Sequence, residues 1–160
     1  MEASNRGGHA AAFGETSVDA LLRRIAREDA GIIPRNDAAW NGTRMAVRNH
    51  GGGFVNHELF FSNMAPGNKV LSDGVLLKAI TAQFGSVDAF RKEFVEAGAK
   101  VFGSGWAFLV YIPASKTLRI VSTPNQDIPE FVSGLAGSDC VSILALDVWE
   151  HAYYLKVHLI

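Results

Sequence analysis

The segment Asp147-Val-Trp-Glu-His151 combines residue types that can bind a metal ion. An Asp, a Glu and a His lie within five positions, directly after an apolar run and among aromatic residues. Charged groups are costly in such a setting unless they are paired or bound to a cation. Asp147 and His151 are four residues apart, so both could reach one ion at the start of a helix. A buried Asp–His hydrogen bond is the alternative, and the segment by itself leaves both open.

A metal site needs a further ligand from elsewhere, and His57 is the best candidate. It lies among the aromatic residues of an expected helix, although a lone histidine in that position can also be a hydrogen-bonded core residue. Two His and one Asp suit Fe, Mn or Zn. Cys140 is the single cysteine, so a cysteine-based zinc cluster is not expected, and a redox-active Fe or Mn is at least as well supported.

Composition limits the function classes further. The chain has 160 residues, of which 48% are hydrophobic, which is enough for a core and argues against disorder. Fifteen basic and sixteen acidic residues give a net charge of -1, so nucleic acid is not an expected partner. The apolar run Trp106 to Ile112 is too short to span a membrane. Charged residues make up 19%, against a usual value of about 25%, which suggests some surface buried against another subunit.

The cellular compartment is left open by the sequence. A single cysteine excludes an internal disulfide and fits a reducing compartment, but a secreted protein without disulfides would look the same. The first fifteen residues lack the apolar centre of a signal peptide and carry little Arg or Ser for a transit peptide. An intracellular location, whether mitochondrial, plastid or cytoplasmic, is the expectation.

The elements that must position these residues change in kind along the chain. Helical spacing dominates up to about Lys100, and short apolar runs with turn residues follow. Three consecutive glycines, Gly51 to Gly53, cost a helix roughly 2–3 kcal/mol, so they locally predict a break. The expected helices are Thr16 to Ala30, Asp37 to Asn49, Phe54 to before Pro66, Ser72 to Gly85, Ser86 to Lys100 and Trp149 to Leu155; the expected strands are Trp106 to Ile112, Thr117 to Ser122 and Val141 to Leu146.

Helices followed by a small, mostly antiparallel sheet indicate an α+β fold. Residues 1–15 are expected to form a loosely ordered lead and residues 16–66 an N-terminal helical region. Residues 70–160 are expected to form an α/β region.

Four motifs resemble the iron/manganese superoxide dismutases, and they occur in the order typical of that family. The resemblance runs from about Thr16 to Lys156, and the glycine stretch and Phe84-Gly-Ser-Val-Asp-Ala-Phe90 fit it as well. The segment after Asp147 is close to a family signature by itself. The motifs are Asn56-His57-Glu-Leu-Phe-Phe61, Phe102-Gly-Ser-Gly-Trp-Ala-Phe108, Ser122-Thr-Pro-Asn-Gln126-Asp127 and Asp147-Val-Trp-Glu-His-Ala-Tyr-Tyr-Leu155.

The resemblance implies a helical N-terminal region followed by an α/β region with a three-stranded antiparallel sheet. It implies a largely helical path through the glycines, against the local prediction. One Mn or Fe ion per chain would be bound by His57, Asp147 and His151, three of the family's four protein ligands. Gln126 matches the residue that hydrogen-bonds the metal-bound solvent in manganese-type enzymes. The iron-type pattern has a glutamine at the place of Gly53, so the pattern here favours manganese.

Further residues take their expected roles from the same resemblance. Trp106 and Trp149 would line the metal pocket, and Tyr154 would support its edge. Glu150 matches a residue that bridges to the partner subunit's ligand histidine, which implies a homodimer. A glutamate paired within its own chain, with Lys156 or Arg48, is the alternative.

The implied reaction is dismutation: one superoxide leaves as oxygen and a second leaves, with two protons, as hydrogen peroxide.

The match to the family is incomplete at both ends of the chain. The family's first ligand histidine, with a His and a Tyr four and eight positions later, has no counterpart before Thr16, and the C-terminal end of the family is not reproduced. His9 could replace that ligand, but a histidine without a metal role is the simpler interpretation. His50 and His158 have no counterpart among the ligands.

Three functions therefore remain open. The first is a superoxide dismutase whose activity is impaired by the missing first ligand. The second is a non-enzymatic, dismutase-like structural subunit of a larger assembly. The third is an open iron site with two His and one carboxylate. Metal content per chain would separate the first two.

Overall fold

The computed structural model describes residues 17–35, 37–67, 71–131 and 140–157. The expected lead, residues 1–15, lies outside the described residues, as do His9 and His158. Helices precede the sheet in the chain, which confirms the α+β class. The elements are α2 (Val18–Asp29), α3 (Ala38–Ala46), the π-helical turn η1 (Val47–Gly51), α4 (Gly52–Asn63), α5 (Val75–Phe84), α6 (Val87–Ala99), β1 (Gly105–Ile112), β2 (Thr117–Pro124), the 3-10 turn η2 (Pro129–Phe131), β3 (Val141–Asp147), the 3-10 turn η3 (Glu150–Ala152) and α7 (Tyr154–Val157).

Local signals in the sequence begin and end several of these helices. Ser17 caps α2 by accepting a hydrogen bond from the Ala20 amide, and Ser86 caps α6 in the same way. Gly85 ends α5 with a positive φ of 84°, a conformation that glycine adopts without strain. The expected single helix from Trp149 to Leu155 is instead two short pieces, η3 and α7.

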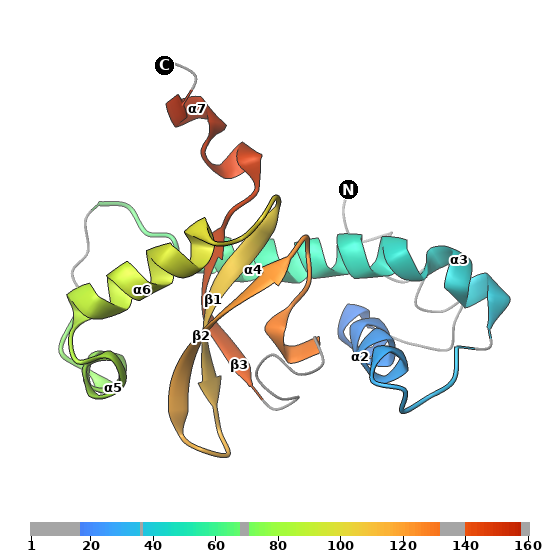
Figure 1. Cartoon of the computed structure of the whole chain (residues 1–160), viewed down its shortest axis with the longest axis horizontal. Coiled ribbons are helices and arrows are strands. Elements are labelled where there is room, and N and C mark those ends of the chain that lie inside the picture. Colours follow the sequence, from blue (N-terminus) through green and yellow to red (C-terminus); the bar gives the residue numbers. More distant parts are fainter. Residues whose placement is uncertain (1–16, 36, 68–70, 132–139, 158–160) are drawn as a thin grey trace.

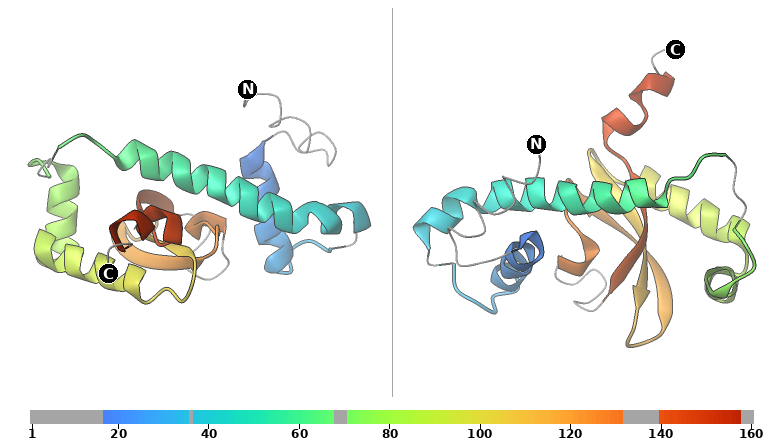
Figure 2. Two further views of the ribbon diagram at one scale, coloured as in Figure 1. Left: turned by 90° about the horizontal axis from the view of Figure 1, so that it is seen from above. Right: turned by 180° about the vertical axis from the view of Figure 1, so that it is seen from behind.

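The predicted break at the glycines is wrong. α3, η1 and α4 form one continuous long helix, which crosses the molecule in Figures 1 and 2. A β-carbon on Gly52 would lie 2.0 Å from the backbone carbonyl oxygen of Gln126, so another segment packs directly on the helix there. This close packing, which a local propensity cannot include, accounts for glycine in a helix interior.

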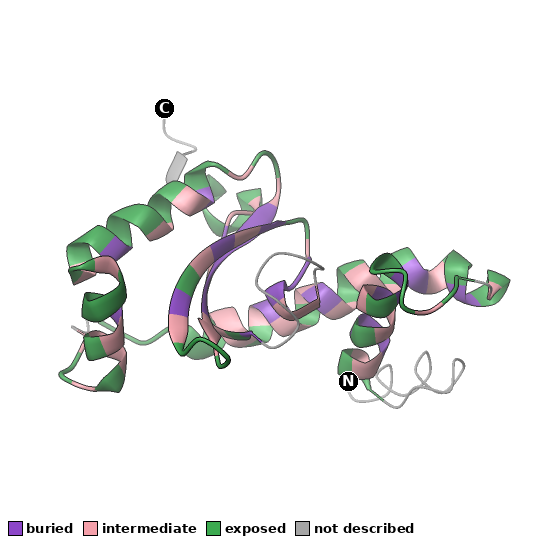
Figure 3. Cartoon of the chain, turned by 60° about the horizontal axis from the view of Figure 1, so that its bottom comes forward, coloured by how far each residue is buried: buried purple, intermediate pink, exposed green. Residues whose placement is uncertain are grey.

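The sheet has three antiparallel strands in the order β2-β1-β3. Side chains of β1 alternate between the two faces. Trp106 and Phe108 pack with residues of α4, whereas Leu109 packs with Ile80 of α5 and Phe90 of α6. β1 is therefore covered on both faces, and Figure 3 shows buried positions along the sheet and on α4.

A separate cluster joins α2 to the start of the long helix. Leu22 and Ile25 of α2 pack against Trp40 of α3 and against Ile128, which precedes η2. The loop that follows β2 is thus fixed between the helical region and the sheet. No helix in the described parts of the chain is both long and apolar enough to cross a membrane.

Candidate metal centre

Asp147, the last residue of β3, is held beside the first residues of β1. It pairs with Trp106 in the sheet register, and the Val148 amide donates to the Gly105 carbonyl oxygen at 3.0 Å. The Trp149 amide donates to Oδ1 of Asp147 at 2.8 Å. The carboxylate is buried, with the residue 7% exposed. One oxygen is therefore held by the backbone, and Oδ2 is the atom that faces the histidines described next.

His57 is presented by α4, one helical turn after Gly53. Its Nδ1–H donates to the Gly53 carbonyl oxygen at 2.8 Å. Because a carbonyl oxygen only accepts, the neutral ring carries its proton on Nδ1 and offers a lone pair on Nε2. The ring packs edge-on against Trp106, with the centroids 5.0 Å apart. Backbone and indole together fix the direction of Nε2.

His57, Asp147 and His151 converge although they come from positions up to 94 residues apart. His57 Nε2 lies 3.4 Å from His151 Nε2 and 3.6 Å from Asp147 Oδ2. His151 Nε2 lies 3.0 Å from the same carboxylate oxygen. The Asp147–His151 hydrogen bond considered from the sequence is thus present, and His57 joins it as a third group.

The chemistry of this donor set fits a metal ion. The three potential ligand atoms all lie within 4.8 Å of one another, and no other group of this kind forms in the described parts of the chain. The Nε2 lone pair of His57 faces a carboxylate oxygen, which is unfavourable unless a proton or a cation lies between them. Two imidazole nitrogens and one carboxylate suit Mn, Fe or Zn.

Gln126 contributes a side-chain amide beside these residues. Its Oε1 accepts hydrogen bonds from Trp106 Nε1 at 3.0 Å and from Asn56 Nδ2 at 3.3 Å, so its NH2 group remains as the donor. Gln126, Gly53 and His57 line one open hollow of about 560 Å³. A β-carbon on Gly53 would lie 3.2 Å from Cδ of Gln126, so the glycine leaves room for this amide.

Comparison of the sequence with known proteins finds relatives of this chain. The sequence model for the C-terminal domain of iron/manganese superoxide dismutases matches residues 72–159, more than half of the chain. A manganese superoxide dismutase of Acinetobacter baylyi is 50% identical over 112 residues, 69% of this chain and 48% of the relative. An iron superoxide dismutase of Raoultella planticola is 46% identical over 123 residues, 77% of this chain and 68% of the relative.

The chain belongs to the iron/manganese superoxide dismutases. The family resemblance found in the sequence is thereby confirmed. A third relative, a manganese superoxide dismutase of Leptolyngbya boryana, is 44% identical over 140 residues, 88% of this chain and 50% of the relative. The chain spans about half the length of the Acinetobacter and Leptolyngbya relatives and about two thirds of the length of the Raoultella relative. Their names include both manganese and iron.

Trp149 and Tyr154 are further residues that the sequence predicted at the metal site. Trp149 lies beside His151. Its indole N–H donates to the Asn125 carbonyl oxygen at 3.0 Å, and its ring centroid is 6.1 Å from that of His151. Tyr154 begins α7, three residues after His151, and is 43% exposed. The pocket-lining role of the two tryptophans and the edge role of Tyr154 stay predictions.

Glu150 begins η3 and is exposed. Its carboxylate makes no hydrogen bond or ion pair with any side chain in the described parts of the chain. Pairing with Arg48, one of the alternatives raised by the sequence, does not occur, because Arg48 pairs with Asp127 and Asp29. The side chain of Lys156 lies outside the described residues. The bridging role of Glu150 therefore stays a prediction.

Sequence reasoning did not predict that three residues of the long helix hold the Gln126 loop. Arg48, Gly52 and Asn56 follow one another at intervals of four, which places them on one face of the long helix. Asn56 Nδ2 donates to the Gln126 carbonyl oxygen at 3.2 Å, and Gly52 packs against the same oxygen. Arg48 pairs with Asp127, 79 residues away. The spacing of these three residues can be read from the sequence, but the sequence does not show that the segment around Gln126 packs on them.

Buried charges also connect the helices. Glu28 accepts hydrogen bonds from Trp40 Nε1 at 2.9 Å, from Arg44 Nε at 3.1 Å and from Arg24 Nε at 3.2 Å. Burial by itself acts to raise the pKa of Glu28, but these three hydrogen bonds outweigh it and lower the pKa below 4.5. The hydrogen bond to Asp127 raises the pKa of the Arg48 guanidinium. Both groups are therefore ionised at neutral pH.

Proposed function

We propose that this chain binds one manganese or iron ion through His57, Asp147 and His151 and dismutates superoxide. The convergence of the three side chains carries the proposal, and the activity named for the relatives supports it. When bound, the ion supplies one-electron chemistry between its divalent and trivalent states, so that one superoxide is oxidised to oxygen and a second is reduced to hydrogen peroxide.

The chain's own residues prepare the ligands for this task. The Nδ1–H bond from His57 to the Gly53 carbonyl orients the ring and makes Nε2 a stronger base. The carboxylate of Asp147 brings a negative charge, which favours the trivalent ion. The Trp149 amide hydrogen bond fixes this carboxylate so that Oδ2 faces both histidines.

Gln126 supports manganese as the metal of this site. Its amide nitrogen remains as a donor beside His57, because Oε1 is engaged by Trp106 and Asn56. A hydrogen bond from this amide to solvent at the site would shift the balance between the two oxidation states of a bound ion. The absence of a side chain at Gly53 is what allows the amide to lie there.

The second candidate function, a non-enzymatic dismutase-like subunit, is favoured by the size of the donor set. Only three potential ligands converge in the described parts of the chain. A site with three protein ligands leaves an additional position to solvent, which lowers metal affinity and changes the potential. We expect activity below that of a family member with four protein ligands.

The experiment measures metal content and superoxide consumption together. The purified chain is expected to hold about one Mn or Fe ion, and His57→Ala is expected to lower the occupancy at least ~10-fold. His50→Ala is the control, because His50 is exposed on the same long helix and lies outside the donor group; it should retain metal. Metal without dismutation would favour the second candidate. Equal metal content in the wild type and His57→Ala would contradict the site itself.

A further inference from the structure

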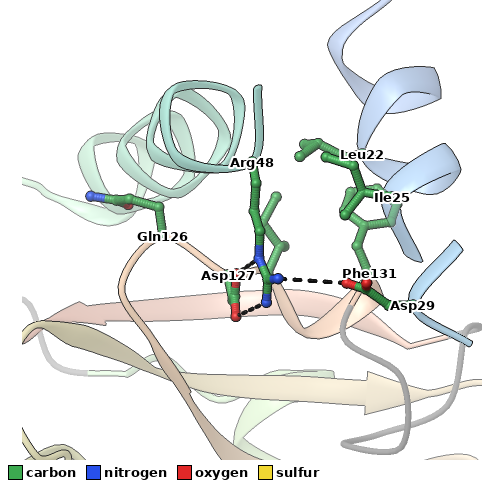
Figure 4. Close-up of a pocket in the computed structure, with 8 residues that line it drawn as sticks. Leu22, Ile25, Asp29, Arg48, Gln126, Asp127 and Phe131 are labelled. Carbon is green, nitrogen blue, oxygen red and sulfur yellow. Dashed lines mark hydrogen bonds and ion pairs between the residues drawn. The ribbon is translucent and has the colours of Figure 1, made fainter. Parts of the chain in front are cut away.

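Asp127 follows Gln126 directly, and the two side chains leave their loop in different directions (Figure 4). Arg48 Nε donates to Oδ1 of Asp127 at 2.5 Å, and Nη2 donates to Oδ2 at 2.6 Å. This is a bidentate, charge-assisted pair, the geometry in which arginine holds a carboxylate most firmly. Asp127 is 7% exposed, and Arg48 is its only side-chain partner in the described parts of the chain.

The surroundings make this pair strong. It lies at a cavity of about 160 Å³ with apolar walls from Leu22, Ile25 and Phe131 (Figure 4). Attraction between opposite charges is less screened in such a place than at an open surface. A third group, Asp29 at the end of α2, lies 3.5 Å from Nη1 of Arg48. The guanidinium thus connects α2, the long helix and the loop after β2.

We propose that Arg48 is a positioning residue for Gln126, acting through Asp127. The proposal rests on the function proposed for the metal site. The Gln126 backbone is also held by Asn56 and by close packing on Gly52. Without Arg48, the carboxylate of Asp127 would be buried and unpaired, and it would turn toward water and move the loop. Gln126 would then lose its place beside His57.

The π-helical turn gives Arg48 a specific place in this arrangement. Val47–Gly51 is the only π-helical stretch in the described parts of the chain, and it interrupts an otherwise α-helical rod. A π-turn adds a residue to one turn of helix and is frequent at functional sites. Here the π-helical turn contacts α2 through Gly51, which lies against Val18 and Leu22, and reaches the Gln126 loop through Arg48.

Two tryptophans provide a readout that needs no metal. They are Trp106 and Trp40, and both side chains are fully buried, with 0% of each residue exposed. The Trp106 indole N–H donates to Oε1 of Gln126 at 3.0 Å, whereas the Trp40 indole N–H donates to Oε2 of Glu28 at 2.9 Å. The first reports the position of Gln126. The second reports the integrity of the helical region, because Glu28 is held by Arg44 and Arg24 and not by Arg48.

The experiment measures indole N–H exchange by NMR in the metal-free full chain. Arg48→Gln is expected to accelerate exchange at Trp106 roughly tenfold or more, since a charge-assisted pair is lost, with no change at Trp40. Arg35→Gln is the matched control, because Arg35 pairs with Asp29 but not with the loop; it should leave both rates unchanged. Equal acceleration at both tryptophans, or none at Trp106, would overturn the proposal.

A conservative variant keeps the test decisive if Arg48→Gln does not fold. Lysine retains the charge but cannot form the bidentate pair. Arg48→Lys is therefore expected to accelerate exchange at Trp106 alone, by less than Arg48→Gln. Unchanged Trp106 exchange in Arg48→Lys would contradict the proposal. A wild-type chain that binds no metal, with these NMR results as expected, would contradict only the function proposed for the site.

Discussion

Gly52 shows at the residue scale how the site constrains the sequence. It is buried in α4 with the Gln126 carbonyl oxygen against it, so a β-carbon would lie 2.0 Å from that oxygen. A backbone atom cannot yield as the end of a flexible side chain can. Gly42, in α3, has nothing within 4 Å of the place of a β-carbon. The two helical glycines therefore have opposite requirements.

We predict that Gly52→Ala destabilises the chain by at least ~2 kcal/mol, because the loop carrying Gln126 must move. Gly42→Ala is expected to stabilise it by roughly 0.5–1 kcal/mol, since alanine is the better residue in an open helical position. Urea denaturation of both variants measures the free energies of unfolding. Equal effects of the two substitutions would show that the close approach at Gly52 is not a constraint.

The helical elements are joined by charges as well as by apolar contacts. The carboxylate of Glu28, on α2, meets Trp40 and Arg44 of α3, and Arg44 also pairs with Asp29. The side chain of Glu28 is 1% exposed. Removing the charge of Glu28 takes from Arg24 and Arg44 the buried carboxylate that they share. The network therefore fixes the angle at which α2 crosses the long helix.

The lowered pKa of Glu28 gives this network a pH dependence. Since its pKa in the folded chain is below 4.5, the ionised carboxylate stabilises the fold above that pH, and the contribution is lost as pH falls through the folded pKa. We predict that Glu28→Gln lowers the free energy of unfolding at neutral pH by about 2–4 kcal/mol and loses less on acidification than the wild type.

Urea denaturation of the metal-free chain at neutral pH and at about pH 3 provides the measurement, because the lower pH lies well below the ordinary range of a glutamate. Asp88→Asn is the control, because the Asp88 side chain is 94% exposed; it should follow the wild type at both pH values. If Glu28→Gln and the wild type lost the same free energy on acidification, the network would not be the source of the acid dependence.

The sequence predicted most elements but not their meeting points. Helical spacing and capping residues placed α2, α5 and α6, and the apolar runs placed the three strands, because these signals are local. The prediction of a break at the glycines was wrong because Gly52 packs against the backbone of Gln126, 74 positions away. This contact requires glycine in the helix, and local helix propensity does not include it. Arg48 and Asp127 were likewise unreadable as a pair. His57, Asp147 and His151 were candidates from their residue types and apolar setting, and the family's motifs then grouped them as ligands of one ion. Helical or strand periodicity says nothing about their convergence.

At the scale of the whole molecule, the candidate metal site lies where the two regions meet. α4 brings His57 from the helical region, and β3 with its continuation brings Asp147 and His151 from the sheet region. Apolar packing of Leu59 and Phe60 against Trp106 and Phe108 holds the two regions together. The geometry of the ligands therefore depends on this interface.

Exposed apolar side chains surround His151 and could contact a second copy of the chain. Tyr153 and Leu155 are 44% and 73% exposed, and Phe61, whose ring lies 6.0 Å from that of His57, is 63% exposed. Exposed aromatic and aliphatic side chains gathered beside a functional site are typical of an interaction surface. Glu150, exposed and next to His151, lies on the same segment. We propose that this segment meets its counterpart in a homodimer.

We predict that Glu150→Ala lowers dimer stability and metal occupancy together. A carboxylate that hydrogen-bonds a ligand histidine across the interface orients that ring, and loss of such an outer partner typically costs about 10–100-fold in metal affinity. Analytical ultracentrifugation and metal analysis of the same samples provide the two measurements. Glu93→Ala is the control, since Glu93 is an exposed glutamate of α6, far from the donor group in sequence. A wild-type monomer, or a Glu150→Ala variant that dimerises and binds metal as before, would show that Glu150 makes no bridge.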